Sequence, residues 1–400
     1  MTIALSRRVQ RVKPSPTLAV TALAAKLRAE GKDIISLGAG EPDFDTPGFI
    51  EEAGVRAIRE HFTRYTDVGG IAELKDAIIE KFRRDNGLHY ERNQILVSTG
   101  AKQTIFNLCM AVLDPGDEVI IPSPYWVSYP DMVMLADGLP VTPDAGPNQG
   151  YKITPRQLEA AITPKTKLVL LNSPCNPTGA AFTRAELQAL GEVLLKYPRI
   201  LIGTDDMYEK IYWGSEPFCS LVTAVPDLYH RTVTINGHSK SYAMTGWRIG
   251  YCGGPKEVIT AMTTIQGQST SNPSSIAQKA AVAALRGDQS CVAEMNKAYK
   301  RRHDLVNEGL NSIPGISCVP GVGTFYAFAD VSKAIARLGL RDDNAFAEYL
   351  LTHAQVAVVA GSGFGCPGHM RISFATSEEL LIEALKRIRK AVSEPTGPVA

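Results

Sequence analysis

A lysine and an arginine stand eight positions apart in residues 236–250, NGHSKSYAMTGWRIG. The segment directly follows an apolar run, residues 233–235, that is short enough to be a buried strand. A lysine that forms an imine must be held where its amine can lose its proton, and a nearby cation helps by lowering the pKa of that amine. A guanidinium offers a planar pair of donors for a phosphate. Lys240 is therefore a candidate covalent nucleophile and Arg248 a candidate phosphate ligand, although an exposed lysine and a salt-bridging arginine are the commoner interpretation of these residue types alone.

Three further polar segments follow short apolar runs. Residues 98–103 (STGAKQ) precede a helical pattern, and backbone N–H groups at a helix N-terminus favour an anion. Asp205 comes after the run at 200–202, where a carboxylate either caps a helix or serves a ligand. Asn176 lies in residues 172–179 (NSPCNPTG), which on their own predict a rigid turn. Each segment taken singly is a weak signal.

The elements that must position these residues alternate along the chain. Six apolar runs have the length of buried strands, and most are separated by segments long enough for a crossover helix: 95–97, 119–121, 168–171, 200–202, 233–235 and 249–251. This alternation predicts an α/β domain whose mainly parallel sheet is covered by helices on both faces. Such sheets bind ligands beyond the carboxyl ends of their strands. Because the candidate residues follow these runs, we expect them to meet in one site.

The pattern changes near residue 291, where a long charged helix precedes short strands and further helices. We therefore predict a large domain at residues 46–290. A smaller α+β domain would be formed by residues 1–45 together with 291–400.

The composition and charge of the chain give no support to several classes of protein. The chain has 400 residues and a net charge of +1, from 42 Lys and Arg against 41 Asp and Glu, so charge gives no support to nucleic acid or an anionic membrane as a partner. No apolar run approaches the roughly 20 residues of a membrane span, and the first residues lack the apolar core of a secretory signal. The seven cysteines have no metal-binding spacing and favour free thiols in a reducing cytoplasm, without a structural metal.

The lysine segment also resembles the signature of the class I and II aminotransferases, which are pyridoxal phosphate (PLP) enzymes of fold type I. The matching positions are Gly237, Ser239, Lys240, Arg248 and Gly250. The resemblance extends over about residues 6–389, and the matching parts occur in the order the family has them. It implies a seven-stranded, mainly parallel sheet sandwiched by helices, a smaller α+β domain, and PLP bound covalently to Lys240.

The resemblance also implies roles for residues that are ambiguous alone. Asp205 would hold the pyridine nitrogen, with Asn176 and Tyr208 on the 3′-oxygen. Trp126, otherwise an ordinary core aromatic, would stack on the ring, and Arg371, otherwise a charged strand residue, would grip the substrate α-carboxylate. The phosphate ligands would be Gly100, Ala101, Lys102, Ser239 and Arg248, with Tyr65 reaching the phosphate of a neighbouring subunit in a homodimer that shares its active sites.

Residues 36–47 (SLGAGEPDFDTP) closely resemble the GEPDFDTP segment of the Iβ, or bacterial, aspartate aminotransferases. That subgroup implies transfer from L-aspartate to 2-oxoglutarate, and some of its members also convert prephenate to arogenate. Gly40 would let the backbone approach the substrate carboxylate. Lys102 would bind the distal carboxylate, and Lys13 belongs to an N-terminal segment that closes over the site, although a solvated role suits Lys13 equally well.

Two alternatives stay open from the sequence. An aromatic or broad-specificity amino acid aminotransferase would share every cofactor-binding residue. A PLP-dependent β-lyase or cyclopropane-forming synthase would use the same scaffold for a different reaction.

Overall fold

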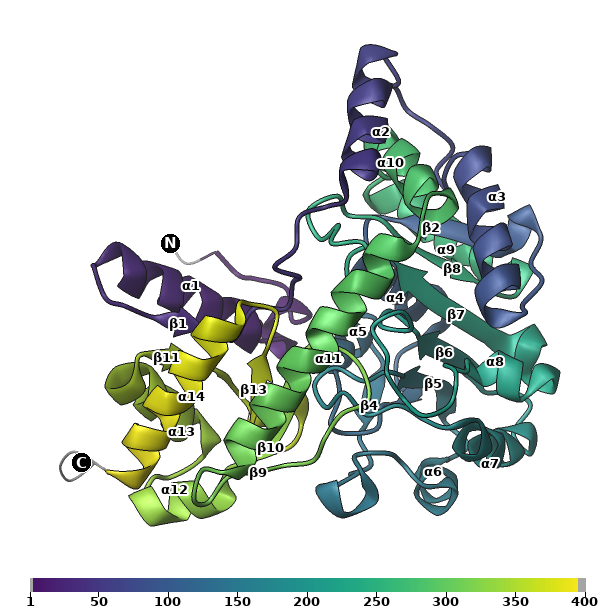
Figure 1. Cartoon of the computed structure of the whole chain (residues 1–400). Coiled ribbons are helices and arrows are strands. Elements are labelled where there is room, and N and C mark those ends of the chain that lie inside the picture. The colour runs from purple at the N-terminus through teal and green to yellow at the C-terminus, as the bar shows by residue number, and fades with distance from the viewer. Residues whose placement is uncertain (1–2, 395–400) are drawn as a thin grey trace.

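A seven-stranded sheet forms the centre of the larger lobe in the computed structural model, which describes residues 3–394 (Figure 1). In spatial order its strands are β2 (Ile95–Ser98), β8 (Gly250–Gly253), β7 (Thr232–Gly237), β6 (Leu201–Asp205), β5 (Thr166–Asn172), β3 (Glu118–Ile120) and β4 (Leu139–Val141). β8 is antiparallel to both of its neighbours, and the other pairs of strands are parallel. The predicted mainly parallel α/β sheet of fold type I is thus confirmed.

The strand at the edge, β4, is absent from the sequence prediction. Its sequence is Leu-Pro-Val, and its first residue is exposed. Proline cannot donate to a ladder and so lies at edges of sheets. A short run that contains proline is not typical of a strand. β4 forms because it pairs with the neighbouring β3, and its own sequence does not show this.

Helices cover both faces of this sheet. Along β5, Leu168 and Leu170 pack into the cluster that contains the α4 residue Leu108, whereas Val169 and Leu171 pack into the cluster that contains the α7 residue Leu190. Alternate residues of a strand point to opposite faces, so the strand is buried on both sides. The helices of this lobe are α2 (Gly48–Arg59), α3 (Ala72–Lys81), α4 (Ala101–Val112), α5 (Ser128–Leu135), α6 (Pro155–Ala161), α7 (Arg184–Leu195), α8 (Leu221–Ala224), α9 (Lys256–Ser269) and α10 (Ser275–Arg286).

The register of the parallel strands fixes where the functional residues lie. Asn172 on β5 pairs with Asp205 on β6, and Asp205 pairs with Ile235 on β7. The carboxyl ends of these three strands are therefore level with one another. The segment that leaves β7 carries Lys240 over the same edge.

The smaller lobe has a sheet of its own. Within residues 3–394 its four strands are antiparallel, in the order β12 (Val359–Ala360), β13 (His369–Ser373), β10 (Tyr326–Asp330) and β9 (Ser317–Cys318). A short parallel pair, β1 (Ile35–Ser36) with β11 (Val356–Ala357), ties the N-terminal segment to this lobe. Its helices are α1 (Pro16–Ala29), α12 (Ser332–Leu338), α13 (Asp343–Tyr349) and α14 (Glu378–Ser393).

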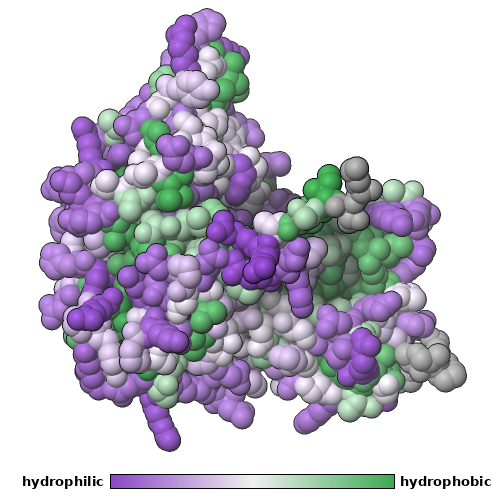
Figure 2. Space-filling model, turned by 180° about the vertical axis from the view of Figure 1, so that it is seen from behind, coloured by the Kyte–Doolittle hydropathy of each residue, from purple (hydrophilic) through white to green (hydrophobic). Residues whose placement is uncertain are grey.

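One long helix, α11 (Ser290–Asn311), runs from the larger lobe to the smaller one (Figure 1). Figure 2, seen from behind, shows the surface hollowed between the two lobes. The domain boundaries at 45/46 and 290/291 stay a prediction, and residues 1–2 and 395–400 of the predicted smaller domain lie outside the described residues. None of the helices in the described part of the chain is long and apolar enough to cross a membrane.

A buried ion pair anchors the turn that follows β6. Lys81, the last residue of α3, pairs with Glu209, and their side chains are 2% and 4% exposed. Asn86 completes the cluster by accepting from Lys81 Nζ at 2.7 Å and donating to Glu209 Oε2 at 2.9 Å. Glu209 is next to Tyr208 in sequence, so this cluster holds the turn that begins with Asp205.

Replacing Glu209 by Gln should leave the Lys81 ammonium buried without its counter-ion. Breaking a buried pair from one side costs about 3–5 kcal/mol of unfolding free energy. We expect a clearly lower urea midpoint for the cofactor-free protein, followed by circular dichroism. Glu294→Gln, which removes an exposed i,i+3 pair with Lys297, is the matched control and should leave the midpoint unchanged. Equal midpoints for the two variants would contradict the anchoring role of Glu209.

Candidate active site

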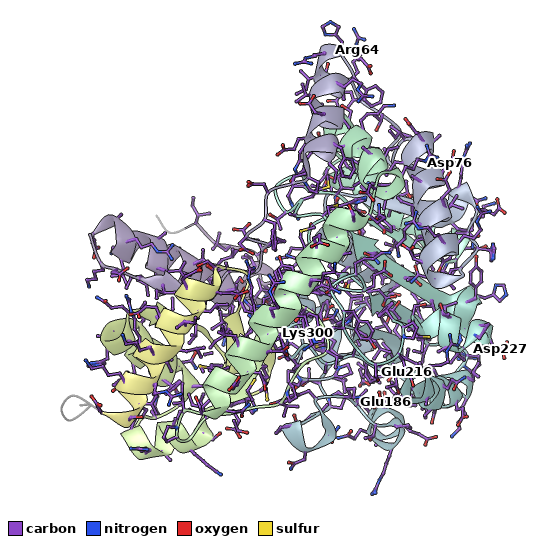
Figure 3. All side chains as sticks on the ribbon, viewed as in Figure 1. Arg64, Asp76, Glu186, Glu216, Asp227 and Lys300 are labelled. Carbon is purple, nitrogen blue, oxygen red and sulfur yellow. The ribbon has the colours of Figure 1, made fainter. Side chains whose placement is uncertain are left out.

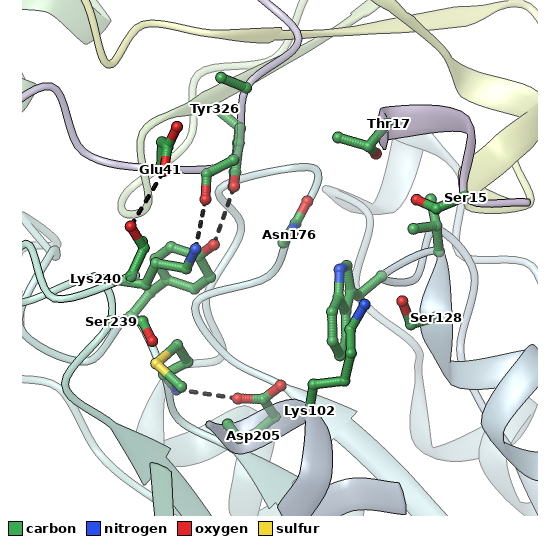
Figure 4. Close-up of a pocket in the computed structure, with 18 of the residues that line it drawn as sticks. Ser15, Thr17, Glu41, Lys102, Ser128, Asn176, Asp205, Ser239, Lys240 and Tyr326 are labelled. Carbon is green, nitrogen blue, oxygen red and sulfur yellow. Dashed lines mark hydrogen bonds between the residues drawn. The ribbon is translucent and has the colours of Figure 1, made fainter. Parts of the chain in front are cut away.

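A cavity of about 380 Å³ lies at the carboxyl edge of the large sheet, where the smaller lobe faces it. This is a usual size for a small-molecule site. The residues from the sequence prediction that line it are Gly40, Ala101, Lys102, Trp126, Asn176, Asp205, Tyr208, Ser239, Lys240, Arg248 and Arg371. In Figure 4, Lys240, Ser239, Glu41 and Tyr326 lie on one side of the cavity, and Lys102, Ser128, Ser15 and Thr17 lie on the other.

Lys240 extends into this cavity from the segment after β7, and its Nζ donates to the backbone oxygen of Gly40 (Figure 4). Burial lowers the pKa of the amine to about 8, helped by the positive charges of Arg248 and Arg371. At neutral pH, a larger fraction of this amine is uncharged than that of an exposed lysine. The side chain therefore has the property that imine formation and proton transfer both require.

Asp205 is buried at the end of β6, and both of its carboxyl oxygens have donors. The hydroxyl of Tyr129 donates to Oδ2 at 2.6 Å, and the backbone N–H of Met207 donates to Oδ1 at 3.2 Å. Burial raises the pKa of this carboxyl, and the Tyr129 bond opposes that shift. A cation placed against the carboxyl would keep it ionised. Its neighbour Asp206 is buried outside the cavity.

An anion cradle lies at the start of α4. Gly100 is the N-cap, with φ of +81°, and a Cβ there would lie 2.3 Å from an Nη atom of Arg248. A Cβ at Gly250 would lie 2.2 Å from the backbone nitrogen of Ala101. These contacts leave room for glycine alone. The first N–H groups of α4 have no acceptor within the helix, so together with Arg248 and Ser239 they can bind a phosphate.

Arg371, on β13, is 1% exposed and has neutral partners. It donates to Asn176 Oδ1 at 3.0 Å and to the backbone oxygen of Gly38 at 2.8 Å, while its Nε has no partner. Among the described residues, no carboxylate forms a salt bridge with it. A buried cation that lacks a counter-ion is costly, so the arrangement favours an incoming carboxylate.

A second cation lies across the cavity. Lys102 Nζ is 5.0 Å from the centroid of the Trp126 ring, a cation–π distance. Burial lowers the pKa of Lys102, and the charge of Arg248 adds to the effect. The indole thus holds the ammonium at the cavity wall, on the same side of the cavity as Ser128 and the α1 residue Thr17 (Figure 4).

Three of the predicted residues do not line the cavity. Gly100 lies directly behind it, against Arg248. Lys13 lines a neighbouring hollow of about 530 Å³ that it shares with Lys102 and Arg248. Tyr65 is 92% exposed, and its neighbour Arg64 lies at the outer tip beyond α2 (Figure 3), so Tyr65 cannot serve the cavity of its own chain.

The sequence prediction missed several residues of the site. Asn172 donates to the backbone oxygen of Asp205 and accepts from the backbone N–H of Asn176, both at 2.8 Å. As a polar residue that ends an apolar run, it carried the same signal as Asp205. Tyr129, within α5, and Tyr326, in the smaller lobe, carried no such signal, because their role depends on packing between distant segments.

The residues present fit PLP on structural grounds. The cavity offers a partly neutral lysine, a buried carboxylate, an aromatic ring at the wall and an anion cradle at a helix N-terminus. These groups match an aldehyde, a pyridine nitrogen, a flat ring and a phosphate, respectively.

The lowered pKa of Lys240 can be tested in the cofactor-free protein. Acetic anhydride acylates uncharged amines, so labelling of Lys240 should be half-maximal near pH 8. Lys196, whose pKa is raised by its hydrogen bond to Glu159, should label only at higher pH. Trace labelling across pH, with mass spectrometry of the peptides, measures both lysines in the same sample. Labelling of Lys240 in parallel with Lys196 would contradict the effect of burial.

Comparisons with known proteins agree with this geometry. The family model of the class I and II aminotransferases matches residues 32–388. The chain is 59% identical to an aspartate/prephenate aminotransferase of Nitrosomonas europaea, over 97% of this chain and 100% of that protein. A similar solved structure is the aspartate aminotransferase of Rhizobium meliloti, with a TM-score of 0.94 and 49% identity over 98% of this chain and 99% of that chain. Another is the aspartate aminotransferase of Thermus thermophilus with maleate, with a TM-score of 0.92 and 45% identity over 97% of this chain and 100% of that chain. The chain therefore belongs to the class I and II aminotransferases, which are PLP-dependent enzymes that act on small amino and 2-oxo acids.

Proposed function

We propose that the protein transfers the amino group of L-aspartate to 2-oxoglutarate, giving oxaloacetate and L-glutamate, and that prephenate is a further acceptor, giving arogenate. The observation that carries this proposal is the pair of cations, Arg371 and Lys102, that line one cavity. A dicarboxylic substrate can place one carboxylate on each. The relative from Nitrosomonas europaea is named for aspartate and prephenate and that from Rhizobium meliloti for aspartate, which supports these two substrates.

Bound PLP supplies a conjugated ring that withdraws electrons from the substrate carbon. In our proposal Lys240 binds the aldehyde, Asp205 the ring nitrogen, and Tyr208 and Asn176 the 3′-oxygen. Trp126 would stack on the ring. The phosphate would be held by Gly100, Ala101, Lys102, Ser239 and Arg248, which surround the start of α4.

Lys240 also carries the proton in this proposal. Arg371 holds the α-carboxylate with a pair of hydrogen bonds, and Gly40, without a side chain, lets its backbone come close to it. Once the substrate amino group has displaced Lys240 from the aldehyde, its uncharged Nζ would take the proton from the substrate Cα and return it to the cofactor carbon that carried the aldehyde. Such general acid–base catalysis contributes about 10²–10⁴-fold. The Gly40 oxygen is the acceptor that holds Nζ in place between these steps.

The assembly and the compartment belong to the proposal as well. Tyr65 is almost fully exposed and distant from its own cavity, which supports a homodimer in which it reaches the partner's phosphate site. The segment with Lys13 would close over the substrate from the neighbouring hollow. All seven cysteines are free thiols, and most are buried, which supports a reducing cytoplasm.

A broad-specificity or aromatic aminotransferase is the second candidate. Leu18, Trp126 and Val127 give the cavity an apolar wall beside Lys102. An aromatic side chain can pack on that wall, as can the ring of prephenate.

A donor and acceptor panel distinguishes these functions. Purified protein with PLP should transfer from aspartate to 2-oxoglutarate faster than from phenylalanine or tyrosine, and should aminate prephenate with aspartate as donor. Borohydride reduction followed by peptide mapping should place a pyridoxyl group on Lys240. Lys240→Ala should stay folded and lose at least about 10²–10⁴-fold of the rate. Release of pyruvate from cystathionine, a donor with a leaving group on Cβ, in the absence of an acceptor, or a label on another lysine, would refute the proposal.

Lys102 gives a test of substrate choice. Lys102→Met keeps the backbone N–H of the phosphate cradle and the packing on Trp126 but removes the charge. A lost charge-assisted hydrogen bond is worth about 1.5–3 kcal/mol, so KM for aspartate should rise roughly 10- to 100-fold. KM for phenylalanine should not rise. Lys196→Met, at an exposed pair, is the control. An equal change for both donors would place the distal carboxylate elsewhere.

A further inference from the structure

Tyr326 is a buried tyrosine that connects the two lobes inside the cavity. It is the first residue of β10 in the smaller lobe, it is 1% exposed, and it lines the cavity. Its hydroxyl lies 3.1 Å from that of Tyr208, which belongs to the larger lobe. A Cβ at Gly40 would also lie 3.1 Å from this hydroxyl, so the glycine leaves the space that the hydroxyl uses.

The ring of Tyr326 contacts Arg371 directly. β10 pairs with β13 so that Phe328 is opposite Arg371, and Tyr326, two residues earlier, shares that face. The guanidinium carbon lies 4.3 Å from the centroid of the Tyr326 ring. This cation–π contact fixes the guanidinium at its position in the cavity. One side chain thus contacts both the cation and the phenol of Tyr208.

The direction of the hydrogen bond between the Tyr326 and Tyr208 hydroxyls follows from the single proton that each phenol carries. Burial raises the pKa of Tyr208 well above its ordinary value, so this phenol keeps its single proton. If Tyr208 donates that proton to the 3′-oxygen of PLP, its own oxygen can only accept. Tyr326 must then be the donor in the pair. Donors in a chain polarise one another, so the bond from Tyr326 makes Tyr208 a stronger donor.

We propose that Tyr326 is a positioning residue that couples substrate binding at Arg371 to the hydrogen bond that Tyr208 makes with PLP. The free Arg371 cation, lying on the ring, makes the Tyr326 hydroxyl a better donor. A carboxylate that neutralises Arg371 weakens this effect, so Tyr208 then withdraws less charge from the 3′-oxygen. With PLP bound, the nitrogen that joins it to Lys240 would then be more basic when substrate is present. This inference rests on the proposed function.

Other charged side chains also act on Tyr326, Tyr208 and Lys240, and a substitution at Tyr326 leaves those side chains unchanged. Tyr326 is faced by Arg371 on β13, by Glu41 in the segment before α2 and by the Tyr208 phenol after β6. Arg371 and Asp205 also act directly on Tyr208. Lys240 is faced by Arg248, Arg371, Glu41 and Asp205. A change that follows the Tyr326 hydroxyl alone is therefore separable from these charges.

The test is a pH titration of the visible absorption of the holoenzyme, with and without succinate, a dicarboxylate that has no amino group. Tyr326→Phe keeps the ring on Arg371 and removes only the hydroxyl. Without succinate, we expect its midpoint about half a pH unit above that of the unsubstituted protein, from the net worth of one hydrogen bond. Succinate should raise the midpoint in the unsubstituted protein and raise it less in Tyr326→Phe.

Two further variants separate coupling from packing. Tyr90→Phe removes another buried tyrosine hydroxyl, bonded to Thr234 at 3.2 Å outside the cavity, and should titrate like the unsubstituted protein. Tyr326→Leu also removes the ring from Arg371, so KM for aspartate should rise about tenfold, whereas Tyr326→Phe should change KM little. Identical midpoints and succinate shifts for Tyr326→Phe and the unsubstituted protein would overturn the coupling. An unsubstituted protein without a visible pH-dependent band would instead overturn the proposed function.

Discussion

The parallel register of β5, β6 and β7 is the constraint on which the site depends. It sets Asn172 beside Asp205 and brings the end of β7 to the same level. Backbone hydrogen bonds of the sheet hold this register, and a slip of one residue would turn each side chain to the opposite face. Residues that are more than sixty positions apart, such as Asn172 and Lys240, are thereby held over one edge of the sheet.

The side chains that line the cavity at this edge carry more positive than negative charge. Of the described residues that line the cavity, Lys102, Lys240, Arg248 and Arg371 are basic, and Glu41 and Asp205 are acidic. Of these basic residues Arg371 is buried, with neutral hydrogen-bond partners, which costs folding free energy, and the cost falls when an anion enters. The same excess explains the lowered pKa of Lys240, since its cationic form is disfavoured by burial and by two neighbouring guanidinium groups. Anion binding and an uncharged lysine therefore have one physical origin.

The large sheet and the site residues that directly follow its strands could be predicted from the sequence. Buried central strands are continuous apolar runs, and a polar residue after such a run must lie at the carboxyl edge. Asp205 and Lys240 follow that rule. β4 and the two-residue strands β1 and β9 were missed, because they exist only through pairing with neighbours. Tyr129 was missed because its bond to Asp205 joins residues 76 positions apart, and nothing local marks it.

The smaller lobe completes the site through contacts that could not be predicted from polar residues following apolar runs. Arg371 reaches the cavity from β13, and its two acceptors, Asn176 and the Gly38 oxygen, come from the larger lobe and from the segment that joins the lobes. The pair of phenols, Tyr208 and Tyr326, crosses the same boundary. Any shift of the smaller lobe must therefore alter the partners of Arg371 and of Tyr208 together. In our proposal, carboxylate binding at Arg371 and the hydrogen bond of Tyr208 to PLP thus depend on one interface, which a single lobe could not provide.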